Sequence, residues 1–156
     1  MKKKPYIIAF FFFLMDLTSK QIIAHIMNIN ESIKVIDNFF YITYTHNNGA
    51  AWSILKDQRI LLLIITVIVL FLINKYMNKE KLNNIETFSY GMIIGGIVGN
   101  LFDRIIFKYV IDFLDFKIFG YDYPIFNLAD TFIVIGIILM IIISIRKELN
   151  ERSNSR

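Results

Sequence analysis

The sequence contains no cysteine, and this absence removes several kinds of chemistry from consideration. Disulfide bonds, thiolate metal sites and a cysteine nucleophile all require a thiol. The two histidines, His25 and His46, form no H-E-x-x-H zinc motif, and no G-x-S-x-G motif marks a serine hydrolase. Ser19 and Lys20 are adjacent, and adjacent helical residues do not face each other as a serine–lysine pair would. Any hydrolytic chemistry must therefore come from other side chains.

Charged residues are few, at 19% of the chain, whereas hydrophobic residues make up 56%. An ordinary soluble domain is roughly 45–50% apolar, and this chain has a mean hydropathy of +0.54. A helix crosses a bilayer with about 20 mostly apolar residues. Four segments qualify, namely residues 6–26, 60–77, 88–107 and 124–145. We therefore expect an all-α membrane protein with four transmembrane helices, forming one polytopic domain over residues 1–156.

Two segments between the apolar runs have a β-like character. Aromatic and β-branched residues alternate with polar ones across residues 32–53, and residues 110–119 show a similar composition. Irregular or sheet backbone cannot face lipid, whereas aromatic side chains are favoured at the membrane interface. We expect these segments to form a small extracytoplasmic β-structure at the outer surface.

The net charge of +4 could indicate a nucleic-acid partner, but the distribution of basic residues argues against one. Ten basic residues fall on one side of a four-span topology: Lys2, Lys3, Lys4, Lys75, Lys79, Lys81, Arg146, Lys147, Arg152 and Arg156. The opposite side carries five: Lys34, Lys56, Arg59, Lys108 and Lys117. The positive-inside rule predicts that both termini lie in the cytoplasm. The basic residues orient the protein and do not require a nucleic acid.

Two aspartates, Asp112 and Asp130, are the principal functional candidates. Asp130 is the only charge in the apolar segment 124–145, and Asp112 lies near the outer end of the third span. Ionisable groups at membrane depth are costly and usually functional. Both aspartates are expected at one depth, where an outward loop joins the two spans. Two nearby carboxylates can share a proton and activate water, so we predict a catalytic dyad.

The first span contains a second charged pair, Asp16 and Lys20. They stand four residues apart, so they share a helix face and can form an ion pair. One interpretation is a purely structural pair near the outer end of the helix, since pairing is how a membrane protein tolerates such groups. The other is that the pair orients the catalytic site. The sequence leaves both open.

The third and fourth spans supply further polar candidates. Asn100, Asp103 and Arg104 stand at i, i+3 and i+4 and share a helix face. Arg104 can pair with Asp103 and still donate to substrate carbonyls, although a purely structural network is an alternative. Asn127 lies three residues before Asp130, so its amide can donate to a nearby carboxylate. The glycines that precede Asn100 predict close helix packing.

The order of motifs along the whole chain resembles that of bacterial lipoprotein signal peptidases (signal peptidase II). The matching segments are residues 16–20 (DLTSK), 47–52 (NNGAAW), 95–104 (GGIVGNLFDR), 110–113 (VIDF) and 126–130 (FNLAD). Each motif alone would be weak, but five in order are specific. Two residues depart from the family pattern: Leu17, where a polar residue is frequent, and Trp52, where phenylalanine is usual.

The resemblance implies an aspartic endopeptidase with Asp112 and Asp130 as the dyad and no metal or cofactor. It implies a diacylglyceryl-modified prolipoprotein as substrate, cut just before the lipidated cysteine at the outer face of the bacterial cytoplasmic membrane. It also implies a monomer in contact with membrane lipid and an outer β-cradle over residues 32–53. The residues that match positions around substrate or dyad are Asn47, Gly96, Asn100, Arg104, Asn127 and Ala129, while Asp16 and Lys20 carry the first motif.

One rival function from a different class is a small proton-coupled membrane transporter. In that case Asp16, Lys20 and the two dyad carboxylates would form a proton relay. Transport predicts polar groups through the full depth of the membrane. The cytoplasmic halves of the four apolar segments contain almost none, so the sequence favours the peptidase.

Overall fold

The computed structural model describes residues 3–49 and 55–154, which form four long helices and a small antiparallel sheet. The helices are α1 (Lys4–Ile26), α2 (Arg59–Lys79), α3 (Asn84–Ile106) and α4 (Leu128–Asn154). All four are long and apolar enough to cross a membrane. The predicted fold class, four transmembrane helices with a small β-structure, is confirmed.

Helices α3 and α4 begin at polar caps rather than at the ends of the apolar runs. α3 starts four residues before the expected segment because Asn83 and Glu86 form a capping box, with both hydrogen bonds at 2.8 Å. α4 starts at Leu128, four residues after the expected position, because residues 124–127 are not helical, Phe126 bridges to Leu114 of the sheet, and Asn127 provides the cap. Such caps bind the N–H groups that the first helical turn leaves unpaired.

The sheet combines two segments that are far apart in the sequence. Its strands are β1 (Ser32–Ile36), β2 (Phe40–Asn47), β3 (Val110–Ile118) and β4 (Tyr121–Asp122), in that spatial order and all antiparallel. The central pair, β2 and β3, places Asn47 opposite Val110 and Thr45 opposite Asp112. The prediction of β-structure in residues 32–53 and 110–119 is therefore confirmed where β1, β2 and β3 form. Residues 50–53, including Trp52, lie outside the described residues.

Helix α3 forms the centre of the helical layer, with α1 on one side and α4 on the other. Glycines permit this close approach: a Cβ on Gly95 would lie 2.6 Å from the Ala9 carbonyl oxygen of α1, and one on Gly96 would overlap the Ala129 carbonyl oxygen of α4. Residues of α3 are mostly buried, whereas α2 is the most exposed of the four helices. An apolar helix with so much exposed surface is suited to contact with lipid.

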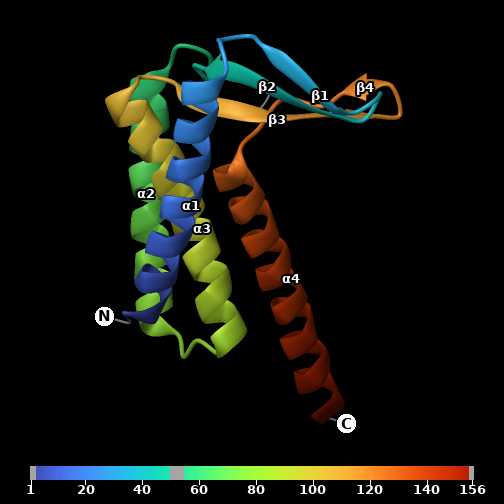
Figure 1. Ribbon diagram of the computed structural model, residues 1–156. Helices are drawn as coiled ribbons and strands as arrows, with labels where there is room; N and C mark the ends of the chain where they lie inside the picture. The colour runs from blue at the N-terminus through green and yellow to red at the C-terminus, as the bar shows by residue number, and fades with distance from the viewer. Residues whose placement is uncertain (1–2, 50–54, 155–156) are drawn as a thin grey trace.

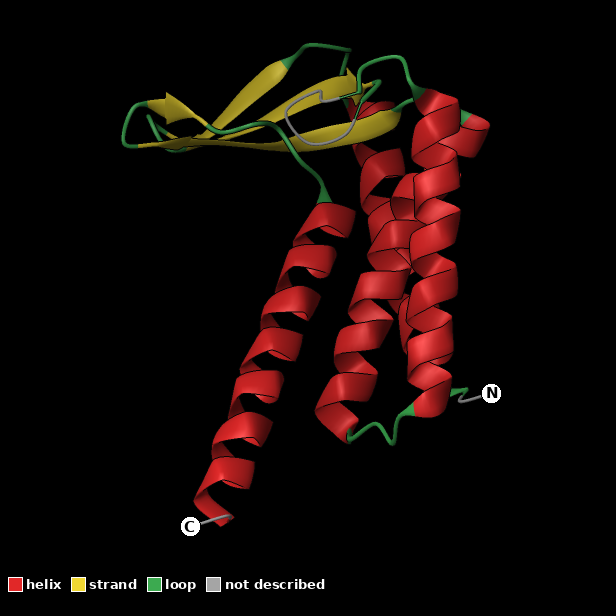
Figure 2. Cartoon of the chain, turned by 180° about the vertical axis from the view of Figure 1, so that it is seen from behind, coloured by secondary structure: helices red, strands yellow, loops and turns green. Residues whose placement is uncertain are grey.

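The sheet covers one end of the helices, and both chain termini lie at the opposite end (Figure 1). The sheet extends sideways past the bundle of α1, α2 and α3 and over the beginning of α4. Seen from behind, α4 diverges from the other helices toward its C-terminus (Figure 2). The fold thus brings the start of α4 and the strands β2 and β3 together at one end of the molecule.

Candidate functional site

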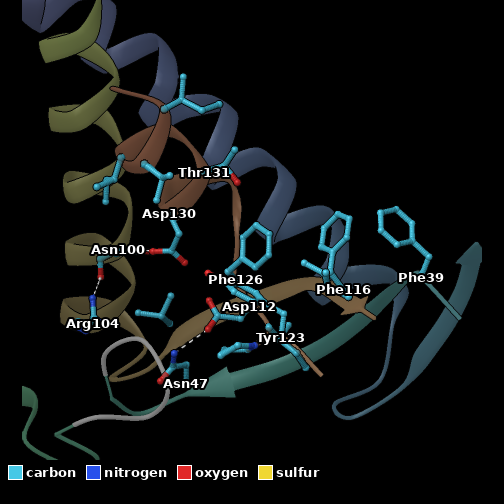
Figure 3. A pocket seen from close by; sticks show the side chains of 17 residues that line it. Phe39, Asn47, Asn100, Arg104, Asp112, Phe116, Tyr123, Phe126, Asp130 and Thr131 are labelled. Carbon is cyan, nitrogen blue, oxygen red and sulfur yellow. Dashed lines mark hydrogen bonds between the residues drawn. The ribbon is translucent and has the colours of Figure 1, made fainter. Parts of the chain in front are cut away.

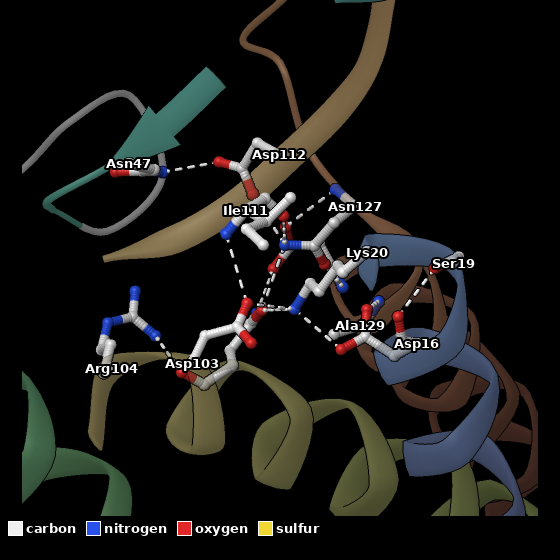
Figure 4. Close-up of polar contacts among 12 residues, drawn as sticks. Asp16, Ser19, Lys20, Asn47, Asp103, Arg104, Ile111, Asp112, Asn127 and Ala129 are labelled. Atoms are coloured by element: carbon white, nitrogen blue, oxygen red, sulfur yellow. Dashed lines mark hydrogen bonds and ion pairs between the residues drawn. The ribbon is translucent and has the colours of Figure 1, made fainter. Parts of the chain in front are cut away.

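A buried lysine connects helices α1 and α3 beneath the sheet (Figure 4). Lys20 Nζ lies 2.7 Å from Asp16 Oδ2, 3.0 Å from Asp103 Oδ2 and 2.9 Å from Asn100 Oδ1. The ammonium group thus uses its three donors on three acceptors, and none of these side chains has more than slight solvent exposure. Asp16 and Lys20 pair as predicted, and Asp103 joins them.

Asp16 also reaches the first turn of α4. Its Oδ1 accepts a hydrogen bond from the backbone N–H of Ala129 at 2.9 Å. That N–H is one of the donors that the start of a helix leaves without an intrahelical partner. A Cβ on Gly99 would overlap Asp16 Oδ2, so the absence of a side chain at position 99 makes room for this carboxylate. Asp16 of α1 therefore binds one of the free N–H groups at the start of α4.

The side chain of Asn100 connects this buried network to Asp130 by hydrogen bonds. Its Oδ1 accepts from Lys20, and its Nδ2 donates to Asp130 Oδ1 at 2.8 Å. Asn127 Nδ2 donates to the same Asn100 oxygen at 3.1 Å. Asn100 thus orients a carboxylate on α4 from its position on α3, which supports its assignment as a site residue.

Asp130 is the third residue of α4 and completes a capping box with Asn127. The backbone N–H of Asp130 donates to Asn127 Oδ1 at 3.0 Å, and the backbone N–H of Asn127 donates to Asp130 Oδ2 at 3.3 Å. The helix dipole favours negative charge at this position. The Asp130 carboxylate is therefore fixed by the backbone geometry of the helix start.

Asp112 lies on β3 rather than at the end of the third helix, because α3 stops at Ile106. Its Oδ1 accepts from Asn127 Nδ2 at 2.6 Å, and its Oδ2 accepts from Asn47 Nδ2 at 2.8 Å. Only 2% of the residue is exposed, and burial together with the charge of Asp130 raises its pKa to about 7. Asp112 can therefore exchange a proton close to neutral pH.

The two aspartates line one cavity of about 630 Å³ between the sheet and α4. Figure 3 shows both carboxyl groups facing this space. Polar side chains lie at one end, and the remaining wall is apolar and includes four aromatic side chains. Its main apolar residues are Phe39, Phe116, Ile118, Tyr123, Phe126, Val134 and Ile135. The cavity can accommodate a polar backbone segment beside the carboxylates and a hydrophobic group farther along.

Arg104 points toward the sheet and not toward Asp103. Its Nη2 donates to the Gly49 carbonyl oxygen at 2.8 Å and its Nη1 to the Asn100 carbonyl oxygen at 3.4 Å. Asp103 instead pairs with Lys20 of α1, with Lys20 Nζ 3.0 Å from Asp103 Oδ2. Arg104 also lines the cavity, and its guanidinium group has five N–H donors. This position is the one expected for a side chain that donates to substrate carbonyls.

All the residues predicted from the sequence lie in or next to this arrangement. Gly96 contacts Ala129, and Asn47, Asn100, Arg104, Asp112 and Asp130 line the cavity. Sequence reasoning did not foresee the backbone contributions, such as the Ile111 N–H that donates to Asp103 Oδ2 at 3.2 Å. It also missed the aromatic wall, for which the only signal was the aromatic content of the β-like segments.

Together, the fold and the site define a multi-pass membrane protein with two carboxylates facing a partly apolar cavity. Comparison with known proteins gives the family. The family model for signal peptidase (SPase) II matches residues 8–146. The chain therefore belongs to the signal peptidase II family, and it is a peptidase. This membership supports the peptidase interpretation and not the transporter.

Curated relatives and solved structures agree with this assignment. The chain is 42% identical to the lipoprotein signal peptidase of Staphylococcus haemolyticus, covering 97% of this chain and 99% of the relative. It is 43% identical to the lipoprotein signal peptidase of Halothermothrix orenii, over 88% of this chain and 92% of the relative. A bacterial membrane enzyme solved by the in meso method at 2.3 Å superposes with a TM-score of 0.87, at 39% identity, over 94% of this chain and 90% of the other. A second such enzyme, solved at 1.9 Å, superposes with a TM-score of 0.80 at 41% identity. This match covers 88% of this chain and 90% of the other.

Proposed function

We propose that the chain is an aspartic endopeptidase that removes the signal peptide of diacylglyceryl-modified prolipoproteins. Asp112 and Asp130 are its catalytic dyad. The observation that carries this proposal is that both carboxylates line one cavity and both accept hydrogen bonds from Asn127, Asp112 from its side-chain amide and Asp130 from its backbone N–H. The reaction requires no metal or cofactor, because two carboxylates of different protonation state supply both an acid and a base.

The proposed mechanism uses one ionised and one protonated carboxyl group. Asp130, at the positive end of α4, acts as the base and takes a proton from a water molecule. The resulting hydroxide adds to the scissile carbonyl carbon, while protonated Asp112 donates its proton to the carbonyl oxygen. Collapse of the tetrahedral intermediate breaks the C–N bond, and the leaving nitrogen receives a proton from the dyad.

The supporting side chains have separate roles in this proposal. Asn47 and Asn127 donate to the two oxygens of Asp112, and Asn100 donates to Asp130, so both carboxyl groups keep their orientation as protons move. Arg104 has donors that can bind a substrate carbonyl. Asp16, Lys20 and Asp103 hold the helices that carry these residues, and Gly96 and Ala129 allow α3 and α4 to approach.

The lipid of the substrate explains the apolar part of the cavity. A diacylglyceryl group attached to cysteine stays in the membrane, so the adjacent peptide bond is presented at a fixed depth. The wall formed by Phe116, Phe126 and Val134 can cover such a group beside the dyad. We propose that both termini are cytoplasmic, that the cavity opens at the outer face of the cytoplasmic membrane, and that the monomer is active.

Cleavage of a purified, diacylglyceryl-modified prolipoprotein tests this function. Asp112→Asn and Asp130→Asn should each abolish cleavage while the thermal unfolding midpoint stays close to that of the wild type. Asp115→Asn is a matched control, because Asp115 lies on the same strand but hydrogen-bonds Thr43 away from the cavity. The unlipidated precursor should be a poor substrate. Near-normal cleavage by either dyad variant would falsify the assignment of the catalytic residues.

A further inference from the structure

A second recessed surface lies on the helices, away from the dyad. One hollow of about 440 Å³ is lined by Leu72, Ile73, Lys75, Tyr76, Lys79 and Tyr90. An adjoining hollow of about 510 Å³ has walls from α2 and α4 and a floor from α3. Ile73 and Tyr90 line both, so the two hollows form one groove. We call this continuous surface the α2–α4 groove.

The groove has the length of one membrane leaflet. From Lys79 to Val69 its α2 wall rises ten residues, which is about 15 Å at 1.5 Å per residue. The hydrocarbon core of a bilayer is about 30 Å thick, so this distance is about half of it. The floor and the α4 wall are almost entirely apolar, with Ile93, Ile97 and Ile137 among them. An acyl chain running along the helices fits this shape.

The end of the groove nearest the chain termini is basic and aromatic. Lys75 and Lys79 both line it and are exposed, and among the described residues neither ammonium group forms an ion pair with a carboxylate. Tyr76 and Tyr90 lie beside them, with ring centroids 6.4 Å apart. Tyrosine and lysine at a membrane interface place their polar groups at the depth of lipid headgroups.

We propose that the α2–α4 groove binds an anionic glycerophospholipid from the leaflet on the side of the chain termini. Lys75 and Lys79 bind its phosphate, Tyr76 covers the glycerol region, and one acyl chain occupies the groove over α3. The headgroup is expected to be anionic, because two exposed ammonium groups at the end of an apolar groove attract a negatively charged lipid. This site is separate from the dyad and does not depend on the proposed catalytic mechanism.

A simpler role for these lysines is to orient the protein in the membrane, as any basic residue on this side does. The two roles make different predictions. Orientation depends on the number of charges, so Lys81 and Arg146 contribute to it equally although they do not line the groove. A lipid site depends on the position of the charge and on the shape of the apolar groove beside it.

Native mass spectrometry of the detergent-solubilised full-length protein distinguishes these roles. Dioleoyl phosphatidylglycerol and dioleoyl phosphatidylcholine, which carry the same acyl chains, are titrated separately. The wild type should bind phosphatidylglycerol more tightly. The double variant Lys75→Gln/Lys79→Gln should weaken this binding about 10- to 30-fold, given the attraction of each basic residue to anionic lipid. The matched double variant Lys81→Gln/Arg146→Gln should leave it unchanged.

A second pair of variants tests the apolar part of the groove. Ile137 lines the groove, whereas its neighbour Ile138 does not, and both are about half exposed, at 44% and 49%. Ile137→Trp should therefore reduce phosphatidylglycerol binding and Ile138→Trp should not. Equal binding of the two lipids, or equal losses within either pair of variants, would overturn the proposal. Thermal unfolding midpoints close to the wild type show that each variant is folded.

Discussion

Asn127 Nδ2 donates a hydrogen bond to Asp112 Oδ1 at 2.6 Å, although the two residues belong to different layers of the molecule. Asn127 is the cap of helix α4, and Asp112 lies on strand β3. One amide side chain therefore joins the sheet to the helix that carries Asp130. It acts together with the backbone hydrogen bonds between Leu114 and Phe126, which join β3 to the segment before α4.

Substitution of Asn127 should separate its capping role from its role in the dyad. Asn127→Ser keeps a side-chain oxygen that can accept from the Asp130 N–H, because serine is a good helix cap. It removes the donor to Asp112, so we expect kcat to fall about 100-fold, by analogy with loss of one catalytic hydrogen-bond donor, with little change in thermal stability. Asn127→Ala should show the same kinetic defect and, in addition, a lower midpoint. Equal kcat for Asn127→Ser and the wild type would contradict this role.

Gly96→Ala should affect activity through the backbone of α4. The added Cβ would overlap the Ala129 carbonyl oxygen, so the start of α4 must shift and Asp130 moves with it. We expect a stability loss of about 1–3 kcal/mol and a larger loss of cleavage. Gly91→Ala creates a similar overlap with Ile8 of α1, far from the dyad. If the two variants lost activity in the same proportion to stability, Gly96 would have no special role.

Replacement of Lys20 should be among the most destabilising single changes in the protein. Lys20→Met leaves two carboxylates, Asp16 and Asp103, buried beside each other without a cation. Removing one partner of a buried ionic network costs about 3–5 kcal/mol. Lys117→Met breaks an exposed ion pair with Asp122 and should cost about 1 kcal/mol or less. Thermal unfolding followed by circular dichroism in detergent measures both changes.

The raised pKa of Asp112 predicts a pH dependence of stability. Between pH 4 and 7 the folded protein keeps a proton on Asp112 that the unfolded chain has released, since burial and Asp130 raise the folded pKa to about 7. This contribution to stability is fully present below pH 4 and is lost as the pH rises through 7. The unfolding midpoint should therefore fall from pH 5 to pH 8, and less steeply in Asp112→Asn. Parallel slopes for the two proteins would exclude this contribution.

The helices and several of the polar residues that meet at the cavity could be predicted from the sequence, because both leave local signals. Long apolar runs define membrane helices, and a charge inside such a run, such as Asp130, is costly enough to mark the residue as a functional candidate. The i, i+4 spacing of Asp16 and Lys20 also predicted their ion pair, which the structure shows.

The remaining features depend on contacts between segments that the sequence does not relate. The sequence offered Arg104 as a partner for Asp103, but in the structure Asp103 pairs with Lys20 of α1. The bond from Asp16 to the Ala129 N–H spans 113 residues and involves a backbone donor, which no side-chain pattern reveals. The starts of α3 and α4 were misplaced by four residues because polar caps, and not hydropathy, determine them.

Lys20 also determines which way the side-chain amides of Asn100 and Asn127 are oriented. An ammonium group only donates, so the side-chain oxygen of Asn100 must face Lys20 and its nitrogen must face Asp130. Asn127 then has to present its own nitrogen to the Asn100 oxygen, and the same nitrogen reaches Asp112. Neither amide can rotate by half a turn without placing two like atoms in contact. The Lys20 ammonium group thus fixes the donor-to-acceptor direction of this chain of hydrogen bonds. As a result, Asn100 and Asn127 both present N–H donors to the two carboxylates.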